Sequence, residues 1–375
     1  MWRDLYNELS ASLDRYDARL DRTPWSGASN VLYSAELAVA DSHRGRALLD
    51  ADLLGIAAHL DGLTDLGVQA VTVNISLPIL HPAFHQSAAE YQGFLNFYRG
   101  IAAALRQRNL QMIVKTQAIA TSPDPRVDAF YRAMGSLAAY TRARSEVART
   151  IAREISPDVI TVQMEPDMEA AVTGQPLLNT PAASAALVST LTGVVLAENP
   201  RIIVGAGAGT WFEPFGDHLD LLTRIPGLDF IDLHVYPASR DYLDRLLYAA
   251  DLAESRGKRL GISEAWLLKL RESELAMAPL FMREVVSRDV YSFWAPLDQR
   301  FLRLLAKTAE RKRIAFISPF WVNYFRAYLD YDQAAFLDPP ALSLASTAAA
   351  MQALRFGRLT GTGITYQALA TLGAR

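Results

Sequence analysis

Eight short apolar segments recur along this chain of 375 residues, and stretches with helical spacing separate them. Each segment is nearly continuously apolar, which is typical of strands that are buried on both faces of a parallel sheet. The segments lie at 31–37, 70–75, 111–116, 159–166, 201–207, 230–237, 260–266 and 314–321. Eight such units in a chain of this length predict an α/β domain, a closed (β/α)8 or TIM barrel.

Helices are expected between these strands, at 52–66, 88–108, 126–155, 181–198, 217–223, 242–255, 299–311 and 341–356. An additional helix is expected before the first strand, because Leu5, Leu9, Leu13 and Leu20 recur with helical spacing. We expect it to pack on the outside of the fold or to cover its bottom. The sequence therefore predicts a helical extension over 1–27 and one barrel domain over 28–375.

An open, doubly wound sheet is the alternative fold for such a pattern. That fold usually carries a glycine-rich phosphate turn after its first strand. Here the first strand runs into Glu36, Leu37 and Ala38, so the barrel is favoured. The glycine-rich run 205–209 lies on the fifth strand and lacks the glycine spacing of a nucleotide-binding turn. It indicates close packing at a strand end and not a nucleotide site.

Composition excludes several classes of function. The net charge is −3 and no basic run stands out, so nucleic acid is not an expected partner. The chain has no cysteine, which rules out disulfides and thiolate metal sites. We expect no membrane span, and no signal peptide in Met1–Asp4, so the chain as written is expected to be cytoplasmic, or secreted if it is the trimmed form of a longer protein. The oligomeric state stays open.

Two glutamates, Glu165 and Glu264, each end one of the apolar segments. In such barrels the reacting groups lie at the C-terminal ends of the strands, so these two side chains should meet at one mouth. A pair of carboxyl groups is what glycoside cleavage needs, one to donate a proton and the other to attack the anomeric carbon or to activate water. We expect desolvation to raise the pKa of at least one of them.

Other polar and aromatic residues at strand ends are expected to contact a substrate, since a sugar ring offers both hydroxyls and an apolar face. Lys115 and Gln117 also end a strand, the third, but the sequence gives them no defined role. The expected substrate-binding residues are His234, Tyr236, Trp321, Asn74, Gln163, Trp266, Glu36 and Trp211.

Four of these short motifs together resemble glycoside hydrolase clan A, the retaining (β/α)8 glycosidases. They are Glu165-Pro166, Ser263-Glu264, the His-x-Tyr at 234–236 and Trp321. The resemblance implies that Glu165 is the acid/base and Glu264 the nucleophile. It further implies that Tyr236 hydrogen-bonds the nucleophile, that Trp321 is the platform under the sugar, and that no metal or organic cofactor is required.

One position departs from the clan, which usually has Asn before the acid/base, where this chain has Met164. Strict strand alternation would turn Met164 toward the helices and Gln163 into the barrel, where Gln163 could take over part of the role of that Asn. The substrate therefore stays open, as does endo or exo action.

We expect a retaining hydrolase of a β-linked oligo- or polysaccharide, with carboxyl groups about 5–5.5 Å apart. Two alternatives remain. The first is a non-catalytic carbohydrate-binding barrel. The second is a metal-dependent sugar isomerase or epimerase, which would use Glu36, Glu165, Asp232, His234 and Glu264 as ligands and bases.

Overall fold

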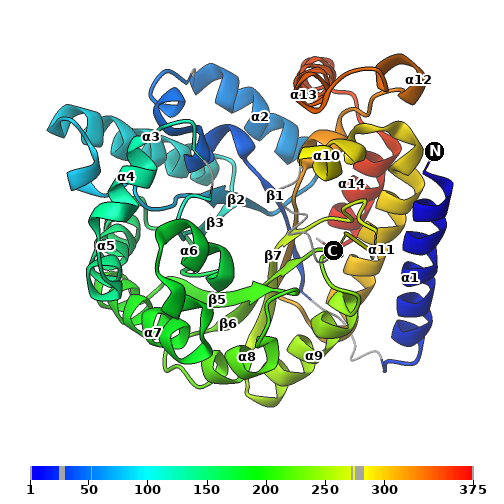
Figure 1. Ribbon diagram of the computed structural model, residues 1–375. Helices are drawn as coiled ribbons and strands as arrows, with labels where there is room; N and C mark the ends of the chain where they lie inside the picture. Colours follow the sequence, from blue (N-terminus) through cyan, green and yellow to red (C-terminus); the bar gives the residue numbers. More distant parts are fainter. Residues whose placement is uncertain are drawn as a thin grey trace.

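The computed structural model describes residues 2–24, 30–51, 53–120, 122–271, 273–274 and 283–373. Eight parallel strands close into a barrel in the order of the chain, and helices surround it (Figure 1). The predicted (β/α)8 architecture is confirmed. The strands are β1 Leu32–Glu36, β2 Ala70–Asn74, β3 Gln111–Lys115, β4 Val159–Thr161, β5 Ile203–Gly209, β6 Phe230–Val235, β7 Arg259–Ala265 and β8 Phe316–Pro319.

Side chains fill the inside of the barrel. At the N-terminal ends of the strands, Phe230 and Phe316 meet edge to face, with ring centroids 5.4 Å apart. The strand glycines make room for these rings, since a Cβ at Gly205 would lie 2.2 Å from the ring of Phe230. This agrees with the close packing expected of the glycine-rich strand. Beyond the rings, a belt of hydroxyl groups runs from Ser34 through Thr72 to Ser318.

The helices form a ring outside the barrel, in the order that the sequence predicts. The longer ones are α1 Arg3–Asp21, α2 Leu53–Asp65, α3 Ala88–Gln107, α4 Arg126–Ala133, α5 Leu137–Thr150, α6 Pro166–Thr173, α7 Pro181–Glu198, α8 Phe215–Thr223, α9 Tyr242–Ser255, α11 Ala295–Lys312, α13 Pro339–Arg355 and α14 Gly361–Gly373. Two single-turn helices, α10 Arg283–Val286 and α12 Tyr331–Ala334, accompany them. By length and composition α7 could cross a membrane, but it packs in this ring against β5, α5 and α8.

Two helix predictions need correction. The single helix expected over 126–155 is split into α4 and α5, because Gly135 takes a φ of 62° and the Ser136 side chain then caps α5. The helix expected over 341–356 is not the last one. It is α13, which lies at the top of Figure 1, while α14 follows it and completes the ring against α11 and β1. Tyr366 of α14 donates to the carbonyl oxygen of Ser34 at 2.5 Å.

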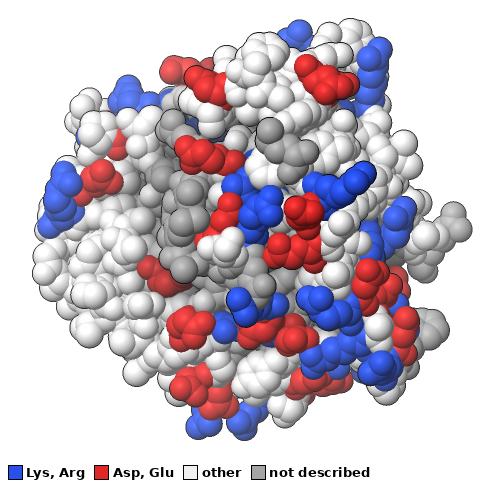
Figure 2. Space-filling model, turned by 45° about the vertical axis from the view of Figure 1, so that its right-hand side comes forward, with Lys and Arg blue, Asp and Glu red and all other residues white. Residues whose placement is uncertain are grey.

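The N-terminal helix α1 lies on the outside of the ring beside α11, as one of its two expected positions had it (Figure 1). Its leucines are buried against the barrel helices. Lys307 of α11 also forms ion pairs with α1, at 2.5 Å from Asp17 and 2.7 Å from Asp21. The predicted boundary between 27 and 28 lies outside the described residues. On the face shown in Figure 2, acidic and basic side chains are mixed, without one broad basic area.

Candidate active site

A cavity of about 870 Å³ opens at the C-terminal ends of the strands. Glu165 and Glu264 both line it, as do His234 and Tyr236 of the sixth strand and its extension. Its other walls come from loops, from the end of β2 and from α6, α10 and α13. They comprise Asp41, His43, Asn74, Ser76, Gln117, Ala120, Met168, Val286, Ser287, Val290, Phe320, Trp321, Asn323, Tyr324, Pro339, Pro340, Ser343, Ser346 and Thr347. The two acids expected to meet at one mouth therefore do share a cavity.

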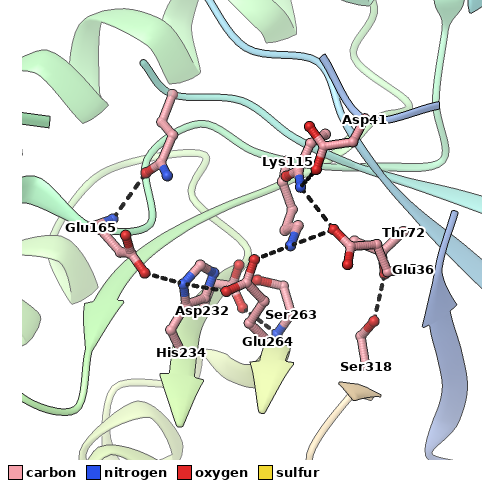
Figure 3. A network of polar contacts seen from close by, with 12 residues as sticks. Glu36, Asp41, Thr72, Lys115, Glu165, Asp232, His234, Ser263, Glu264 and Ser318 are labelled. Atoms are coloured by element: carbon pink, nitrogen blue, oxygen red, sulfur yellow. Dashed lines mark hydrogen bonds and ion pairs between the residues drawn. The ribbon is translucent and has the colours of Figure 1, made fainter. Parts of the chain in front are cut away.

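Glu165 is held where β4 gives way to α6. It is the N-cap residue of that helix, and Pro166 follows at the first helical position, where its missing N–H leaves no helical bond unmade. The backbone N–H of Glu165 donates to the side-chain oxygen of Gln117 at 3.2 Å. The carboxylate accepts from Nδ1 of His234 at 2.7 Å (Figure 3). A helix start and a neighbouring strand thus fix the position of this acid.

Glu264 lies on β7 at a local irregularity. The register between β6 and β7 shifts at His234, and that between β7 and β8 shifts after Ile262. Such shifts bend a strand and redirect a side chain, and they recur beside active sites. Here oxygens of Glu264 and Glu165 and a ring nitrogen of His234 lie within 4.8 Å of one another.

Two hydrogen-bond donors and one imidazole ring contact the carboxylate of Glu264. Lys115 Nζ lies 2.5 Å from Oε1, and the Tyr236 hydroxyl donates to Oε2 at 3.0 Å. His234 Nδ1 lies 3.3 Å from the same Oε2 (Figure 3). With an ammonium group on one oxygen and a hydroxyl donor on the other, this carboxylate is fixed in orientation as well as in charge.

The charges around Glu264 decide its protonation. Burial alone would raise its pKa, but His234 and Lys115 outweigh burial and hold the pKa below its usual range. The pKa values of His234 and Lys115 rise despite their burial, because Glu264 lies beside both of them. The pKa of Glu264 is therefore lowered overall, whereas the sequence led us to expect that desolvation would raise the pKa of at least one of the two acids.

A second acidic group lies behind Lys115, on the side away from Glu165. Glu36 of β1 has its Oε1 3.9 Å from Lys115 Nζ. The Asn74 side chain donates to Glu36 and also to Asp41, at 2.9 Å each. Burial raises the pKa of Glu36 to about 8, although Lys115 opposes the rise. Asp41 in turn holds His43 at 2.6 Å, so a polar chain runs from Glu264 to the cavity wall.

The sequence argument missed Asp41 and His43. They do not end a strand, since Asp41 lies between the 3-10 turns Ala38–Ala40 and Ser42–Leu48 that follow β1, and His43 lies in the second of them. The one available signal was their polarity within a few residues of Glu36, at the mouth side of the first strand. Lys115 was noted at the end of the third strand without a role, and it is the closest cation to Glu264.

The aromatic residues expected in the site divide into two groups. Trp321 lines the cavity with its ring centroid 6.1 Å from that of Tyr236. Trp211 lies on the other side of Tyr236, at 5.8 Å, and donates its indole N–H to Asp167. Trp266 is not at the mouth. It is 1% exposed and packs against Tyr324, so its expected sugar contact is wrong for this geometry.

Gln163 is also placed differently from the expectation. Its amide N–H donates to Glu169 at 2.6 Å, and its oxygen accepts from Ser184 of α7. The side chain is completely buried and points to the helix layer instead of into the barrel. The alternation argument failed because β4 ends at Thr161, two residues earlier, and the chain bends before Glu165. Gln163 therefore cannot take over the role of the missing asparagine.

A cation could be held by the same groups. Within the described ranges, Glu165, His234 and Glu264 are the cluster whose donor atoms lie close enough to share an ion. The other ligands named for an isomerase are less well placed: Asp232 accepts from the backbone N–H of Ser263, and Lys115 lies between Glu36 and Glu264. An ammonium group 2.5 Å from Glu264 competes with any metal for that carboxylate.

Comparisons with known proteins were informative only for the structure. Neither a family profile nor a curated protein sequence matches the chain. An exo-β-1,4-mannosidase from Opitutaceae bacterium strain TAV5 matches 92% of the chain with a TM-score of 0.57 and 16% identity. The chain spans 60% of the length of that mannosidase.

Two further solved structures give similar agreement. An endo-β-1,4-glucanase from Xanthomonas axonopodis pv. citri, in a triply substituted form, matches 84% of the chain and 90% of its own length, with a TM-score of 0.54 and 12% identity. A substituted GH5_18 from Streptomyces cattleya, in complex with Manβ1-4GlcNAc, matches 92% of the chain and 80% of its own length, with a TM-score of 0.53 and 13% identity. The chain therefore shares the (β/α)8 fold of these three proteins.

Proposed function

We propose that this protein is a retaining β-glycoside hydrolase. The observation that carries the proposal is the pair of carboxyl groups from the ends of β4 and β7, with oxygens within 4.8 Å of each other in one cavity. Retaining enzymes keep their two carboxyl groups about 5–5.5 Å apart, while inverting enzymes need a wider gap for a water molecule. The short separation favours double displacement.

In this mechanism Glu264 attacks the anomeric carbon while Glu165 donates a proton to the leaving oxygen. The new bond is an ester between Glu264 and the sugar, and the glycosidic C–O bond breaks. Glu165, now a carboxylate, accepts a proton from the water that cleaves the ester. The lowered pKa of Glu264 supports the nucleophile's role, because the attacking group must be ionised. His234 Nδ1 faces both acids and so stays beside an anion throughout.

For the substrate we propose a β-1,4-linked glucoside or mannoside. A β-1,4-mannosidase and a β-1,4-glucanase are among the solved structures with a similar fold. The lining of the cavity suits a sugar but does not select one. Trp321 and Tyr236 offer aromatic faces, and Asp41, His43 and Asn74 offer hydrogen-bonding groups for hydroxyls.

The experiment is azide rescue with aryl β-glucosides and β-mannosides. Glu264→Ala should lower turnover by roughly 10⁴-fold, because the covalent step is lost. Azide should then restore activity by attacking the anomeric carbon directly and giving a glycosyl azide of inverted configuration. Glu165→Ala should give a glycosyl azide of retained configuration, since there azide attacks the intermediate in place of water. The configuration of each product can be read by NMR.

Glu36→Ala is the matched control, because it removes another acid beside Lys115, one that does not face Glu165. Azide should not restore any activity which that variant loses. A Glu264→Ala enzyme that keeps its turnover contradicts the proposal. Binding of oligosaccharides without turnover by the unaltered protein would instead support a non-catalytic carbohydrate-binding barrel.

The metal-dependent isomerase remains as a second candidate, because three donor atoms of Glu165, His234 and Glu264 lie within reach of one ion. Titration with Mg²⁺, Mn²⁺ or Zn²⁺, followed by calorimetry and an aldose–ketose assay, tests it. Lys115→Met should tighten metal binding if the ammonium group is what opposes it, and a stoichiometric ion together with isomerase activity would replace the hydrolase proposal.

A further inference from the structure

Lys115 lies between two carboxyl groups directly behind the proposed nucleophile (Figure 3). Its Nζ is 2.5 Å from Glu264 Oε1 and 3.9 Å from Glu36 Oε1. The side chain is completely buried, while the side chains of Glu264 and Glu36 are 13% and 7% exposed. A lysine in such a place needs a nearby anion at every stage of a reaction, since an unpaired buried charge is costly.

The proposed reaction removes the nearer anion. When Glu264 becomes an ester it loses its negative charge, and Lys115 loses its partner at 2.5 Å. His234 does not have this problem, because it is 2.7 Å from Glu165, which becomes a carboxylate when the leaving group takes its proton. The negative charge is thus lost from Glu264, beside Lys115, and arises on Glu165, beside His234.

We propose that Glu36 is the alternate counter-ion of Lys115 and ionises when the glycosyl-enzyme forms. This inference rests on the proposed glycosidase function. In the free enzyme Glu36 holds a proton and Lys115 pairs with Glu264. In the covalent intermediate the Glu36 proton passes to water in the cavity and Lys115 pairs with Glu36. Hydrolysis of the ester restores the charge of Glu264, and Glu36 takes a proton back. Glu36 is thus a positioning residue that acts through Lys115.

The surroundings of Glu36 support this exchange. Burial raises its pKa to about 8, Lys115 opposes that rise, and the charges of Asp41 and Glu264 add to it. His43, which pairs with Asp41, is the remaining charged group that faces Glu36. Loss of the Glu264 charge removes one of the two anions that keep Glu36 protonated. Asn74 donates to Oε1 of Glu36, which an ionised carboxylate accepts at least as well.

Proton release on covalent trapping tests the proposal. 2,4-Dinitrophenyl 2-deoxy-2-fluoro-β-glucoside and β-mannoside form the intermediate with a leaving group that needs no proton, and their intermediates hydrolyse slowly. A pH indicator in weak buffer at about pH 7 counts protons released per adduct, and mass spectrometry counts the adducts. Wild-type protein should release about one proton more per adduct than Glu36→Gln, because the amide cannot ionise. Protons from Glu165 or His234 appear in both proteins and cancel in the difference.

Two variants check the cause of the difference. Lys115→Gln keeps Glu36 but removes the cation that needs a counter-ion. This variant should therefore release no more protons per adduct than Glu36→Gln. Asp298→Asn removes an acid from another buried lysine, Lys269, away from the cavity, and should release as many protons as wild type. If Glu36→Gln folds poorly, the Lys115→Gln result still decides the question.

Equal proton release by wild type and both cavity variants, with adducts formed, overturns the role of Glu36 and leaves the glycosidase proposal intact. A kinetic readout separates positioning from general damage: Glu36→Gln should slow formation of the adduct, roughly tenfold, without slowing its hydrolysis. If no variant and no wild-type sample forms an adduct, although aryl glycosides are hydrolysed with azide rescue of Glu264→Ala, the inference also fails. If neither reaction occurs, the proposed function itself is wrong.

Discussion

The molecule contains two clusters of similar composition, each with one lysine, two carboxyl groups and one tyrosine, in different surroundings. The Lys115 cluster consists of Lys115, Glu264, Glu36 and Tyr236, and the Lys269 cluster consists of Lys269, Asp298, Asp289 and Tyr328. Each has a fully buried lysine between two carboxyl groups, and in each a tyrosine hydroxyl donates to the carboxylate that lies 2.5 Å from the lysine.

The clusters differ in symmetry and in access. Lys269 donates to Asp298 at 2.5 Å and to the carbonyl oxygen of Leu267 at 2.6 Å, and it lies 2.8 Å from Asp289, so both carboxyl groups are close to the ammonium group. Trp266 and Trp294 cover it, each with a ring centre 5.7 Å away. Lys115 has one near and one distant partner, and its near partner faces the cavity. The Lys269 cluster, which is buried and has two close carboxyl groups, therefore holds loops together. The Lys115 cluster lies beside the cavity with one close and one distant carboxyl group, so a protonation state there can change during a reaction.

Lys269→Met should have the largest effect, and on stability. The substitution leaves Asp289 and Asp298 buried without their cation, which for broken buried pairs costs about 3–5 kcal/mol. Urea unfolding followed by tryptophan fluorescence measures the loss. Turnover per folded molecule should stay near the wild-type value, because none of these residues lines the cavity. A variant that keeps its stability but loses its activity would reverse the roles given to the two clusters.

Lys115→Met should act on activity first. Without the ammonium group, burial raises the pKa of Glu264, so the acid limb of the pH profile of kcat/KM should move up by about 1–2 pH units. At neutral pH we expect kcat/KM to fall roughly 100-fold, which corresponds to about 2.7 kcal/mol. The urea midpoint should fall less than for Lys269→Met, because Glu264 keeps His234 and Tyr236 and borders the cavity. An unmoved acid limb would mean that Lys115 does not set the charge of Glu264.

Sequence reasoning placed both acids correctly for a physical reason. The strands of a closed parallel barrel end at one rim, so Glu165 and Glu264 were brought together by topology alone. The same reasoning could not rank Lys115, because only the distance of 2.5 Å to Glu264 distinguishes it from any other lysine at a strand end. Asp41 and His43 reach the cavity from turns, and no strand rule predicts where a turn points.

The failures of sequence reasoning have local causes. Gln163 was assigned by alternation, which applies only while a strand continues, and β4 ends at Thr161. Trp266 was assigned by its place after Glu264, but the chain carries it beneath Tyr324. The helical pattern from 126 to 155 hid a break, since the positive φ of Gly135 is visible only in the backbone. In each case the direction of a side chain, or of the chain itself, depends on a few local residues and not on the pattern of the whole element.

Asp289 gives the Lys269 cluster a dependence on pH. Burial raises its pKa to about 7, although Lys269 opposes the rise, and Asp298 and Arg288 are the other charged groups that face it. Between the unfolded value of about 4 and this folded value, the folded protein holds a proton that the unfolded chain releases, so this contribution to stability falls as pH rises through that window. In wild type, this effect should lower the free energy of unfolding by on the order of 1–3 kcal/mol between pH 4 and 7, and Asp289→Asn should abolish that decrease.

Urea unfolding of wild type and Asp289→Asn across this pH range provides the measurement. Only the difference between the two curves is informative, because burial also raises the pKa values of Glu36, Asp232 and Asp298, which contribute with the same sign. Parallel curves would mean that Asp289 does not hold the extra proton in the folded protein.

The smallest effects should come from the two tyrosines, each of which loses one hydroxyl group; the hydroxyl of Tyr328 also contacts Thr362 at 3.0 Å. Tyr328→Phe removes a donor 2.8 Å from Asp298, and should lower the free energy of unfolding by about 1 kcal/mol without changing turnover. Tyr236→Phe removes a donor 3.0 Å from Glu264, and should lower kcat up to about tenfold, because the carboxylate loses part of its orientation, with a smaller loss of stability. If both variants lose only stability, the cavity does not give the Lys115 cluster a separate role. If stability falls only for Tyr328→Phe and kcat only for Tyr236→Phe, two similar sets of side chains serve two different roles, which follow from their symmetry and from their access to the cavity.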